Sequence, residues 1–202
     1  LGICTLYDAV ILGHAPLQLG LCESSEIYSC RELDSFQKVA IYDVCSGMGG
    51  FSLGSHPVGV ETTAFLDTNP LACAVLCCNF TTPVIQGSID DIQCIKKLHA
   101  MKPSAFTQLT GGFPCQPFSK QGDQRGLKDC RGQVLQAILR GSWLLQVDSV
   151  LLECVDNVLH FDDIQQMLDM HAKMAGMNIS KIVFDLQAQW PVRRSEERRV
   201  GK

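Results

Sequence analysis

One of the eleven cysteines in this 202-residue sequence stands in a setting that suits nucleophilic chemistry. Cys115 lies within the segment Gly111–Ser119 (GGFPCQPFS), which follows a short apolar run at residues 105–109. That run predicts a buried strand ending at the glycine pair, so Cys115 would follow the carboxyl end of a strand, where ligands bind in open α/β sheets. Pro114 and Pro117 fix the backbone on either side, and a rigidly held thiol can attack a carbon atom. A free cysteine is more often a small buried hydrophobe, and we assign that role to the other ten.

Two acidic residues are predicted to lie at the same edge of the sheet. Asp67 ends a predicted strand at residues 62–66 and comes about 20 residues after a glycine turn, the spacing at which an acidic residue can meet ribose hydroxyls. Glu153 ends a second predicted strand at residues 149–152. A glutamate is more commonly a surface or helix-capping residue, but its place beside the Cys115 segment favours a catalytic role. The three side chains would therefore converge on one crevice.

The remaining elements that must position these residues alternate between strands and helices. Residues 39–44 read as a buried strand, and Gly47, Gly49 and Gly50 turn it into a helix, so that backbone N–H groups could face a ligand. This glycine turn is shared by many nucleotide-binding proteins and by turns that bind nothing. Further strands are predicted at residues 84–86 and 179–186, and helices at 70–79, 133–146 and 161–175. The pattern predicts an α/β fold from residue 38 onwards, and residues 1–37 receive no assignment.

Composition is typical of a soluble globular protein, with 46% hydrophobic and 19% charged residues in a chain long enough for one sizeable domain. We find neither a signal peptide nor an apolar run of membrane-spanning length, so the many cysteines favour a reducing, intracellular setting. This would be the nucleus in a eukaryote or the cytoplasm in a bacterium. The four clustered cysteines contain no Cys-x-x-Cys pair, so we predict core packing and no metal site for them. They are Cys73, Cys77, Cys78 and Cys94.

The formal net charge of −4 argues weakly against nucleic-acid binding, because DNA-binding surfaces carry excess Lys and Arg. Cations are nevertheless concentrated in the glycine-spaced segment that follows Cys115. They are Lys120, Arg125, Lys128 and Arg131. Beside a nucleophile these residues are candidates for phosphate contacts, and the alternative interpretation is a solvated surface loop.

The Cys115 segment resembles the catalytic loop of the DNA (cytosine-5) methyltransferases, in which Pro-Cys-Gln is followed by Phe-Ser. Two further segments follow the order of that family. Asp43–Phe51 (DVCSGMGGF) resembles its cofactor loop, and Leu152–Val155 (LECV) resembles its Glu-Asn-Val signature. The resemblance runs from about Val39 to Arg194. It implies a partial catalytic domain at residues 38–194, followed by a non-domain tail at 195–202 that is unlike any continuation of the family.

The resemblance implies a Rossmann-like S-adenosylmethionine-dependent methyltransferase fold, with a mostly parallel, truncated sheet and helices on both faces. It also implies methyl transfer to C5 of a cytosine flipped out of double-stranded DNA, with Cys115 adding at C6 and Glu153 assisting at N3. Arg194 would be a further DNA contact. The cofactor residues implied are Asp43, Gly47, Gly49, Gly50, Asp67, Ser88 and Ile89. Ser88 stands where the family has an aspartate, for which Asp90 could substitute, and Cys45 stands where the family usually has phenylalanine.

Three alternatives stay open at this stage. The substrate could be an RNA cytosine, since the mechanism acts on the base, or the chain could be a catalytically silent regulatory module. A dinucleotide-dependent oxidoreductase would use the same glycine turn, but Ser52 stands where a third glycine is expected, and Glu153 and the Cys115 segment would have no role. The family's target-recognition region and closing motifs are not found in the sequence, so we expect this chain alone to be inactive. We expect no membrane partner.

Overall fold

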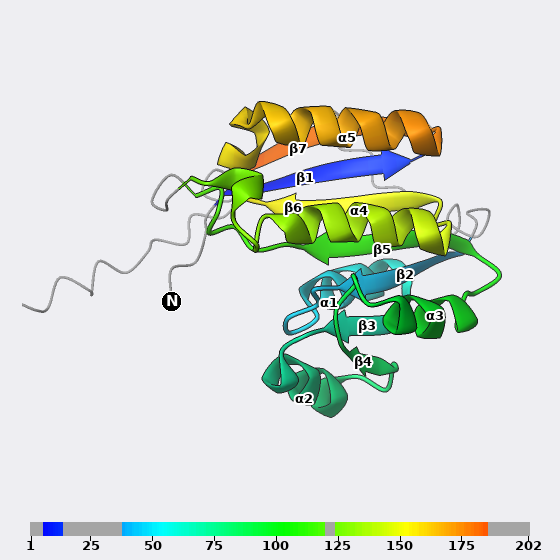
Figure 1. Ribbon diagram of the computed structural model, residues 1–202. Helices are drawn as coiled ribbons and strands as arrows, with labels where there is room; N and C mark the ends of the chain where they lie inside the picture. Colours follow the sequence, from blue (N-terminus) through cyan, green and yellow to red (C-terminus); the bar gives the residue numbers. More distant parts are fainter. Residues whose placement is uncertain (1–5, 14–37, 120–123, 186–202) are drawn as a thin grey trace, which may run out of the picture.

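A twisted sheet of seven strands forms the centre of the computed structural model, which describes residues 6–13, 38–119 and 124–185 (Figure 1). The strands are β1 (Leu6–Gly13), β2 (Val39–Val44), β3 (Glu61–Asp67), β4 (Val84–Gln86), β5 (Phe106–Gly112), β6 (Ser149–Cys154) and β7 (Asn178–Asp185). Their order across the sheet is β4-β3-β2-β5-β6-β1-β7. All pairs from β4 to β6 are parallel, whereas β1 is antiparallel to both β6 and β7.

Helices cover both faces of this sheet. They are α1 (Gly50–Ser55), α2 (Pro70–Asn79), α3 (Ile92–Ala100), α4 (Gln133–Leu145) and α5 (Asp162–Ala175), with short 3-10 helices η2 (His56–Val58), η3 (Gly126–Lys128) and η4 (Asp156–His160). A Cβ atom on Gly111 would lie 3.2 Å from Ile138 of α4, so Gly111 faces α4. Its neighbours Thr110 and Gly112 point to the opposite face, because side chains alternate along a strand. They line a cavity there together with residues of α1. Figure 1 shows α3, α4 and α5 in front of the sheet.

The helix ends follow their local sequence. Asn69 caps α2 by accepting a hydrogen bond from the Leu71 backbone N–H at 2.9 Å, and Pro70 occupies the first helical position. Asp91 caps α3 in the same way. Gly176 ends α5 in the left-handed region at a φ of 67°, a conformation that favours glycine at the end of a helix.

The fold confirms the predicted α/β class and the mostly parallel sheet. The strands expected near residues 39–44, 62–66, 84–86, 149–152 and 179–186 are present. β5 begins within the apolar run that was expected to form a strand and ends at Gly112, the second residue of the glycine pair, as predicted. Two elements were not expected. One is α3, and the other is β1, which lies inside the segment 1–37 that received no assignment.

The prediction that ten cysteines are buried is wrong for several of them. Cys73, Cys94 and Cys154 are buried, but Cys77, Cys78 and Cys130 are exposed. Helix α2 lies at the edge of the sheet against β3 and β4, so it buries only one narrow face through Cys73 and Leu76. Cys4, Cys22 and Cys30 lie outside the described residues.

The described helices include none with the length and apolar character that crossing a bilayer requires. Within the same residues, His, Cys, Asp and Glu side chains form no group of three or more that could hold a metal ion.

Candidate functional site

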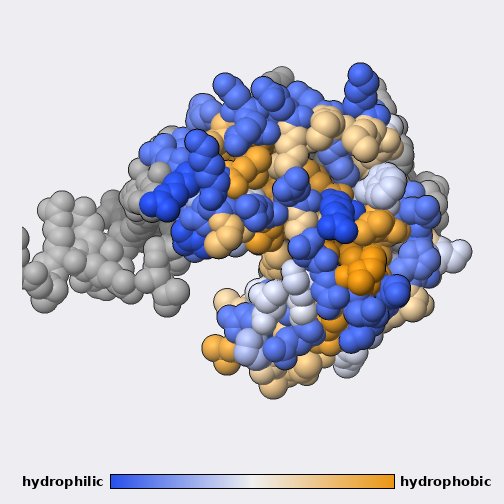
Figure 2. Space-filling view, in the orientation of Figure 1, coloured by the Kyte–Doolittle hydropathy of each residue, from blue (hydrophilic) through white to orange (hydrophobic). Residues whose placement is uncertain are grey.

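Two cavities open at the carboxyl ends of the parallel strands. The first, which we call the Asp67 cavity, has a volume of about 450 Å³. Its walls include Cys45, Asp67, Thr68, Ser88, Ile89 and Pro114. The second, which we call the Glu153 cavity, has a volume of about 690 Å³ on the α1 face of the sheet. Its walls include Cys45, Gly50, Phe51, Thr110, Gly112 and Glu153. Cys45 and Gly112 line both cavities. Figure 2 shows the surface hollowed at the left of the view, at the edge where these strands end.

The carboxylate of Asp67 is held in place by two backbone N–H groups. Gly47 donates to Oδ2 at 2.8 Å, and Asn69 donates to Oδ1 at 2.8 Å. Each oxygen keeps a second lone pair that can accept a hydroxyl hydrogen. Asp67 is therefore oriented in advance at the end of β3, as its spacing from the glycine turn predicted.

The glycine turn supports this carboxylate and packs closely beneath the cavities. Gly47 has a φ of 55° and Gly49 a φ of 82°, the left-handed region that favours glycine. A Cβ atom on Gly49 would lie 2.8 Å from the ring of Phe80, so a side chain would not fit there. Of the three glycines, Gly50 lines the Glu153 cavity, and neither cavity includes Gly47 or Gly49 in its described walls.

Asp43 is placed differently from the cofactor contact that the resemblance implied. Its side chain has no exposed surface, so in this conformation it touches no ligand directly. Oδ2 accepts a hydrogen bond from Ser52 of α1 at 2.9 Å, whereas Oδ1 has no hydrogen-bond partner among the described residues. Burial raises the pKa of Asp43 to about 7. Asp43 therefore joins the end of β2 to the start of α1.

The loop after β4 supplies another part of the wall of the Asp67 cavity. Ser88 and Ile89 line the Asp67 cavity, and Ile89 packs so closely on α4 that a Cβ atom on Gly141 would lie 2.7 Å from it. Asp90, the possible substitute for Ser88, instead pairs with Arg140 at 3.4 Å on the exposed surface. Thr68 also lines the cavity, a position that the sequence analysis did not single out although it directly follows Asp67.

Cys45 lies at the boundary of the two cavities in a conformation unusual for a side chain other than glycine, with a φ of 51°. Burial, and then the negative charges of Asp67 and Asp43, raise the pKa of the Cys45 thiol to about 12. The thiolate is the nucleophilic form of cysteine. Cys45 is therefore a neutral packing group at physiological pH and does not compete with Cys115.

Two buried aromatic side chains anchor the loop that carries Cys115. Phe113 precedes it and Phe118 follows it, with ring centroids 5.6 Å apart and edge-to-face, and Phe118 makes a similar contact with Phe161 at 5.5 Å. The Cys115 carbonyl accepts hydrogen bonds from the N–H groups of Phe118 at 3.0 Å and Ser119 at 2.9 Å. The half-buried Cys115 therefore lies in a turn that is closed on itself and fixed at both ends.

Glu153 lies beside this loop because β5 and β6 are neighbours and Gly112 is paired with Glu153 in register. A Cβ atom on Gly112 would lie only 3.2 Å from Oε2 of Glu153, so the absence of a side chain at Gly112 leaves room for the carboxylate. Glu153 is half-buried, and burial raises its pKa. At a given pH, a larger fraction of Glu153 is therefore protonated than of an exposed glutamate.

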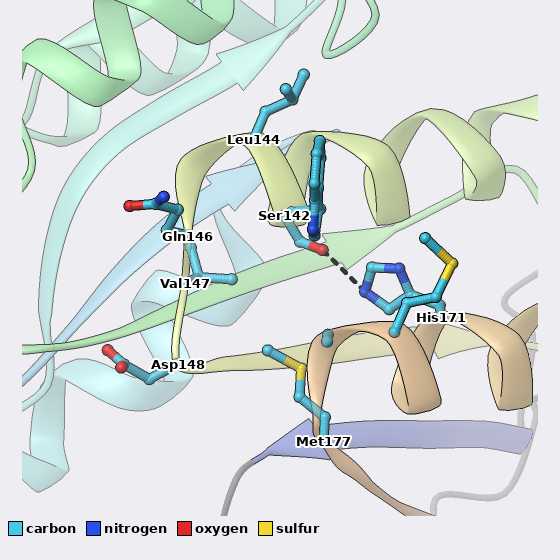
Figure 3. A pocket seen from close by; sticks show the side chains of 10 residues that line it. Ser142, Leu144, Gln146, Val147, Asp148, His171 and Met177 are labelled. Carbon is cyan, nitrogen blue, oxygen red and sulfur yellow. Dashed lines mark hydrogen bonds between the residues drawn. The ribbon is translucent and has the colours of Figure 1, made fainter.

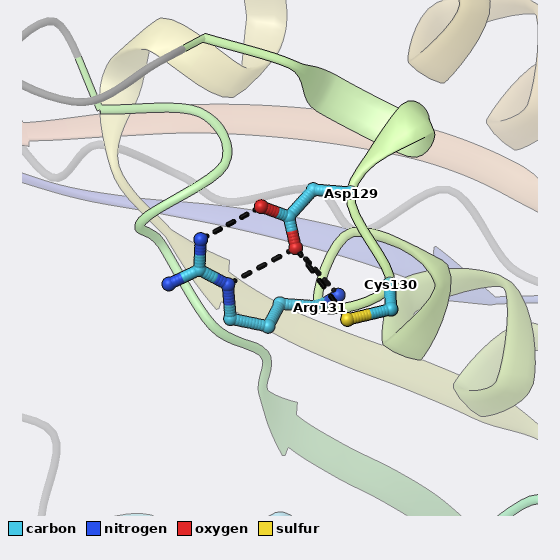
Figure 4. A network of polar contacts seen from close by, with 3 residues as sticks. All are labelled: Asp129, Cys130 and Arg131. Carbon is cyan, nitrogen blue, oxygen red and sulfur yellow. Dashed lines mark hydrogen bonds and ion pairs between the residues drawn. The ribbon is translucent and has the colours of Figure 1, made fainter.

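The cations predicted to contact DNA are only partly described. Arg125, Lys128 and Arg131 are exposed, whereas Lys120 and Arg194 lie outside the described residues. Arg131 lines the Asp67 cavity and donates through Nε and Nη2 to Asp129, at 3.0 and 2.7 Å (Figure 4). These hydrogen bonds lower the pKa of Asp129. Arg131 is thereby oriented next to the cavity mouth.

A third cavity, of about 480 Å³, lies between the ends of α4 and α5 (Figure 3). His171 Nε2 is 3.2 Å from Ser142 Oγ, which donates to the Leu139 carbonyl at 2.7 Å. Burial lowers the pKa of His171. The walls of this cavity include Asp148, which directly precedes β6, whereas Glu153 lies near the other end of that strand. The cavity is therefore separate from the candidate site.

Comparison with known proteins agrees with this arrangement. The profile of the family described as C-5 cytosine-specific DNA methylase matches residues 39–183. The type II methyltransferase M.AquIA of Picosynechococcus sp. is 37% identical over 98 residues, which are 47% of this chain and 40% of that protein. The type II methyltransferase M.PspPI of Psychrobacter sp. is 27% identical over 164 residues, which are 77% of this chain and 38% of that protein. The chain therefore spans about two fifths of the length of these two relatives.

The fold is also similar to that of a solved methyltransferase. A mutant of Spodoptera frugiperda DNMT2 superposes with a TM-score of 0.50 at 20% identity, over 79% of this chain and 54% of that one. At this identity the likeness concerns the fold alone. The family match covers most of the chain and includes Asp67, the Cys115 loop and Glu153. The chain belongs to the C-5 cytosine-specific DNA methylase family.

Proposed function

We propose that this chain carries the catalytic site of an enzyme that transfers a methyl group from S-adenosylmethionine to C5 of cytosine in DNA. The observation that carries the proposal is the position of three groups at or just after the carboxyl ends of the parallel strands β3, β5 and β6. These are the oriented carboxylate of Asp67, the anchored loop of Cys115, and the half-buried acid Glu153. The cavities beside Asp67 and Glu153 share Cys45 and Gly112, so a cofactor in one and a base in the other would be adjacent.

The Asp67 cavity fits the nucleoside part of such a cofactor. Its volume of about 450 Å³ falls within the usual range for small-molecule sites, about 300–1,000 Å³. Asp67 would accept hydrogen bonds from the ribose hydroxyls, while Ile89, Val134 and Ala137 offer apolar surface to a flat ring. When bound, the cofactor supplies an activated methyl group on a sulfonium sulfur.

Cys115 and Glu153 would activate the base. Cytosine C5 is a poor nucleophile while the ring is aromatic. Addition of the Cys115 thiolate forms a bond from sulfur to C6 and moves an electron pair into the ring, where Glu153 relieves the charge by donating a proton to N3. C5 can then take the methyl group. Loss of the C5 proton to solvent, departure of the Cys115 thiolate and return of the N3 proton to Glu153 restore the neutral aromatic ring.

Cofactor binding to the 202-residue chain is the first test. We expect S-adenosylhomocysteine to bind in a calorimetric titration and NAD not to bind, because the cavity offers one oriented carboxylate and the chain lacks the third glycine of a dinucleotide fingerprint. Binding of NAD instead would favour the oxidoreductase.

Covalent trapping tests the nucleophile. In the complete gene product, DNA containing 5-fluorocytosine should form a stable adduct, because fluorine at C5 cannot leave as the proton does. Cys115→Ala should abolish the adduct, whereas the control Cys130→Ala, which removes an exposed thiol from the following segment, should not. An adduct that survives in Cys115→Ala would exclude Cys115 as the nucleophile.

A further inference from the structure

One buried side chain connects the loop of Glu153 to the loop of Cys115. Asn157 belongs to η4, the short helix that follows β6, and it is only 7% exposed. Its Nδ2 donates a hydrogen bond of 2.7 Å to the Phe118 carbonyl. Asn157 and Phe118 are 39 residues apart in the chain, so this contact is not a consequence of local turn geometry.

The contact acts on a part of the Cys115 loop that moves with the cysteine. Phe118 N–H donates to the Cys115 carbonyl at 3.0 Å, so the two residues lie in one closed turn. A shift of the Phe118 carbonyl would therefore shift Cys115. The same turn also accepts the Gly126 N–H through the Pro117 carbonyl at 3.1 Å.

The Asn157 end of this hydrogen bond lies close in the chain to Glu153, the proposed acid. Asn157 lies four residues after Glu153, and Val155 between them is buried. In the proposed reaction the thiol must reach C6 of a ring while the acid reaches N3 of the same ring. The separation of the two groups must therefore match a rigid substrate, and a misplacement of about 1 Å can cost about 100-fold in rate.

We propose that Asn157 is a positioning residue that holds the Cys115 loop in register with Glu153. Asn157 does not touch the reacting atoms, and it acts through the Phe118 carbonyl. The catalytic meaning of this role rests on the proposed methyl transfer, but the coupling between Asn157 and the Cys115 loop does not.

Site-resolved alkylation of the 202-residue chain tests the coupling without any need for activity. Iodoacetamide modification is followed by peptide mass spectrometry, with Cys115 as the reporter and the buried Cys154 as an indicator of global unfolding. Asn157→Leu removes the amide and keeps the number and branching of the side-chain heavy atoms. The matched control is Gln165→Leu, which removes another amide bonded to a carbonyl, that of Leu159 in η4 at 3.1 Å.

We expect Asn157→Leu to raise the Cys115 rate by about fivefold or more, the scale expected from losing one buried hydrogen bond, without change at Cys154. Asn157→Gln keeps an amide donor, so its Cys115 alkylation rate should lie closer to the native rate. The control Gln165→Leu should alkylate Cys115 at the native rate. If Asn157→Leu does not fold, Asn157→Ser gives the same comparison, since its side chain is too short for the contact. A Cys115 rate in Asn157→Leu, or in Asn157→Ser, equal to that of the Gln165→Leu control would overturn the proposal.

A second readout separates this proposal from the proposed function. In the complete gene product, Asn157→Leu should lower kcat by about tenfold or more and leave the KM for the cofactor unchanged, because the Asp67 cavity does not involve Asn157. Equal Cys115 alkylation rates in Asn157→Leu and in the Gln165→Leu control, together with methyl transfer by the complete gene product, would reject only the coupling. A raised Cys115 rate in a protein that forms no adduct with 5-fluorocytosine DNA would reject only the methyltransferase.

Discussion

Three carboxyl groups near the site have three different environments, and these set different roles. Asp43 is fully buried and its pKa is raised to about 7, so it is partly neutral near physiological pH. Asp67 is partly exposed and has both oxygens held by backbone N–H groups, which suits a fixed acceptor. Glu153 is half-buried with a raised pKa, which suits a group that donates a proton. Residue type alone does not separate these roles, whereas burial and hydrogen bonding do.

Substitution of Glu153 should lower the rate of methyl transfer, whereas substitution of Asp67 should weaken cofactor binding. Glu153→Gln should slow methyl transfer by about 100-fold or more, the usual scale for losing a positioned acid, with little change in cofactor affinity. Asp67→Ala should weaken cofactor binding, because it removes the acceptors for the ribose hydroxyls. Single-turnover rates and S-adenosylhomocysteine titrations on both variants measure the two effects. The reverse pattern would show that the two residues have been assigned to the wrong partners.

The stability of the fold should depend on the ionisation of Asp43. The pKa of Asp43 is about 7 in the folded state, whereas an aspartate in the unfolded chain has the ordinary value of 3.8. The folded state therefore binds the proton more tightly. The contribution of Asp43 protonation to the free energy of unfolding is fully present below about pH 4, declines as the pH rises, and is lost above about pH 7. The total change is on the order of a few kcal/mol. Urea unfolding from pH 5 to pH 8 should show this slope, and Asp43→Asn should flatten it; an unchanged slope would exclude Asp43 as its source.

At the scale of secondary-structure elements, the close packing of helix α3 on Gly87 also contributes to the stability of the fold. A Cβ atom on Gly87 would lie 2.3 Å from Sγ of the buried Cys94 in α3. Gly87→Ala should therefore destabilise the protein by about 1–3 kcal/mol. Gly54 of α1 has nothing within 4 Å of such an atom, so Gly54→Ala should be neutral or stabilise by up to about 1 kcal/mol. Denaturant midpoints compare the two, and equal effects would contradict the packing argument.

Buried strands and the chemistry at their ends were predictable because their patterns are local. Asp67 and Glu153 each directly follow a predicted apolar run, and Cys115 lies three residues after the end of β5. Helix α3 also has a local signal, since the cap Asp91 is followed by apolar residues at 94, 95 and 98. The roles of Asp43 and Asn157 depend on contacts with distant residues, and no local pattern indicates such contacts.

Strand β1 was not predictable for a related reason. Its pairing partners lie far along the chain, since Asp8 is paired with Cys154 and with Val183. The sequence of β1 alone does not indicate which edge of a sheet it joins, because strand propensity depends strongly on neighbours. The family match begins at Val39 and also leaves this strand out.

At the scale of the whole molecule, charge sets an expectation for the isolated chain. The formal net charge is −4, and among the described cations near the site Arg131 is paired with Asp129. Specific readout requires side chains aimed at base edges on a surface that also neutralises phosphates. We therefore expect the 202-residue chain to bind duplex DNA weakly, without sequence preference, and to transfer methyl groups at or near background. Methylation assays beside the complete gene product measure this, and robust site-specific methylation by the short chain would refute it.

The place of β1 between β6 and β7 has a consequence for biosynthesis. Of the described strands, β1 leaves the ribosome before the others, yet Leu6 pairs with Asp185 and Asp8 with Cys154. At about 5–20 residues per second, roughly 10–30 s pass between synthesis of β1 and of β6. During that interval the nascent strand has neither of its ladder partners, while β2 to β5 can already assemble. Among the described strands, β1 therefore waits longest for its partners, and a chaperone that shields residues 6–13 would act on this step.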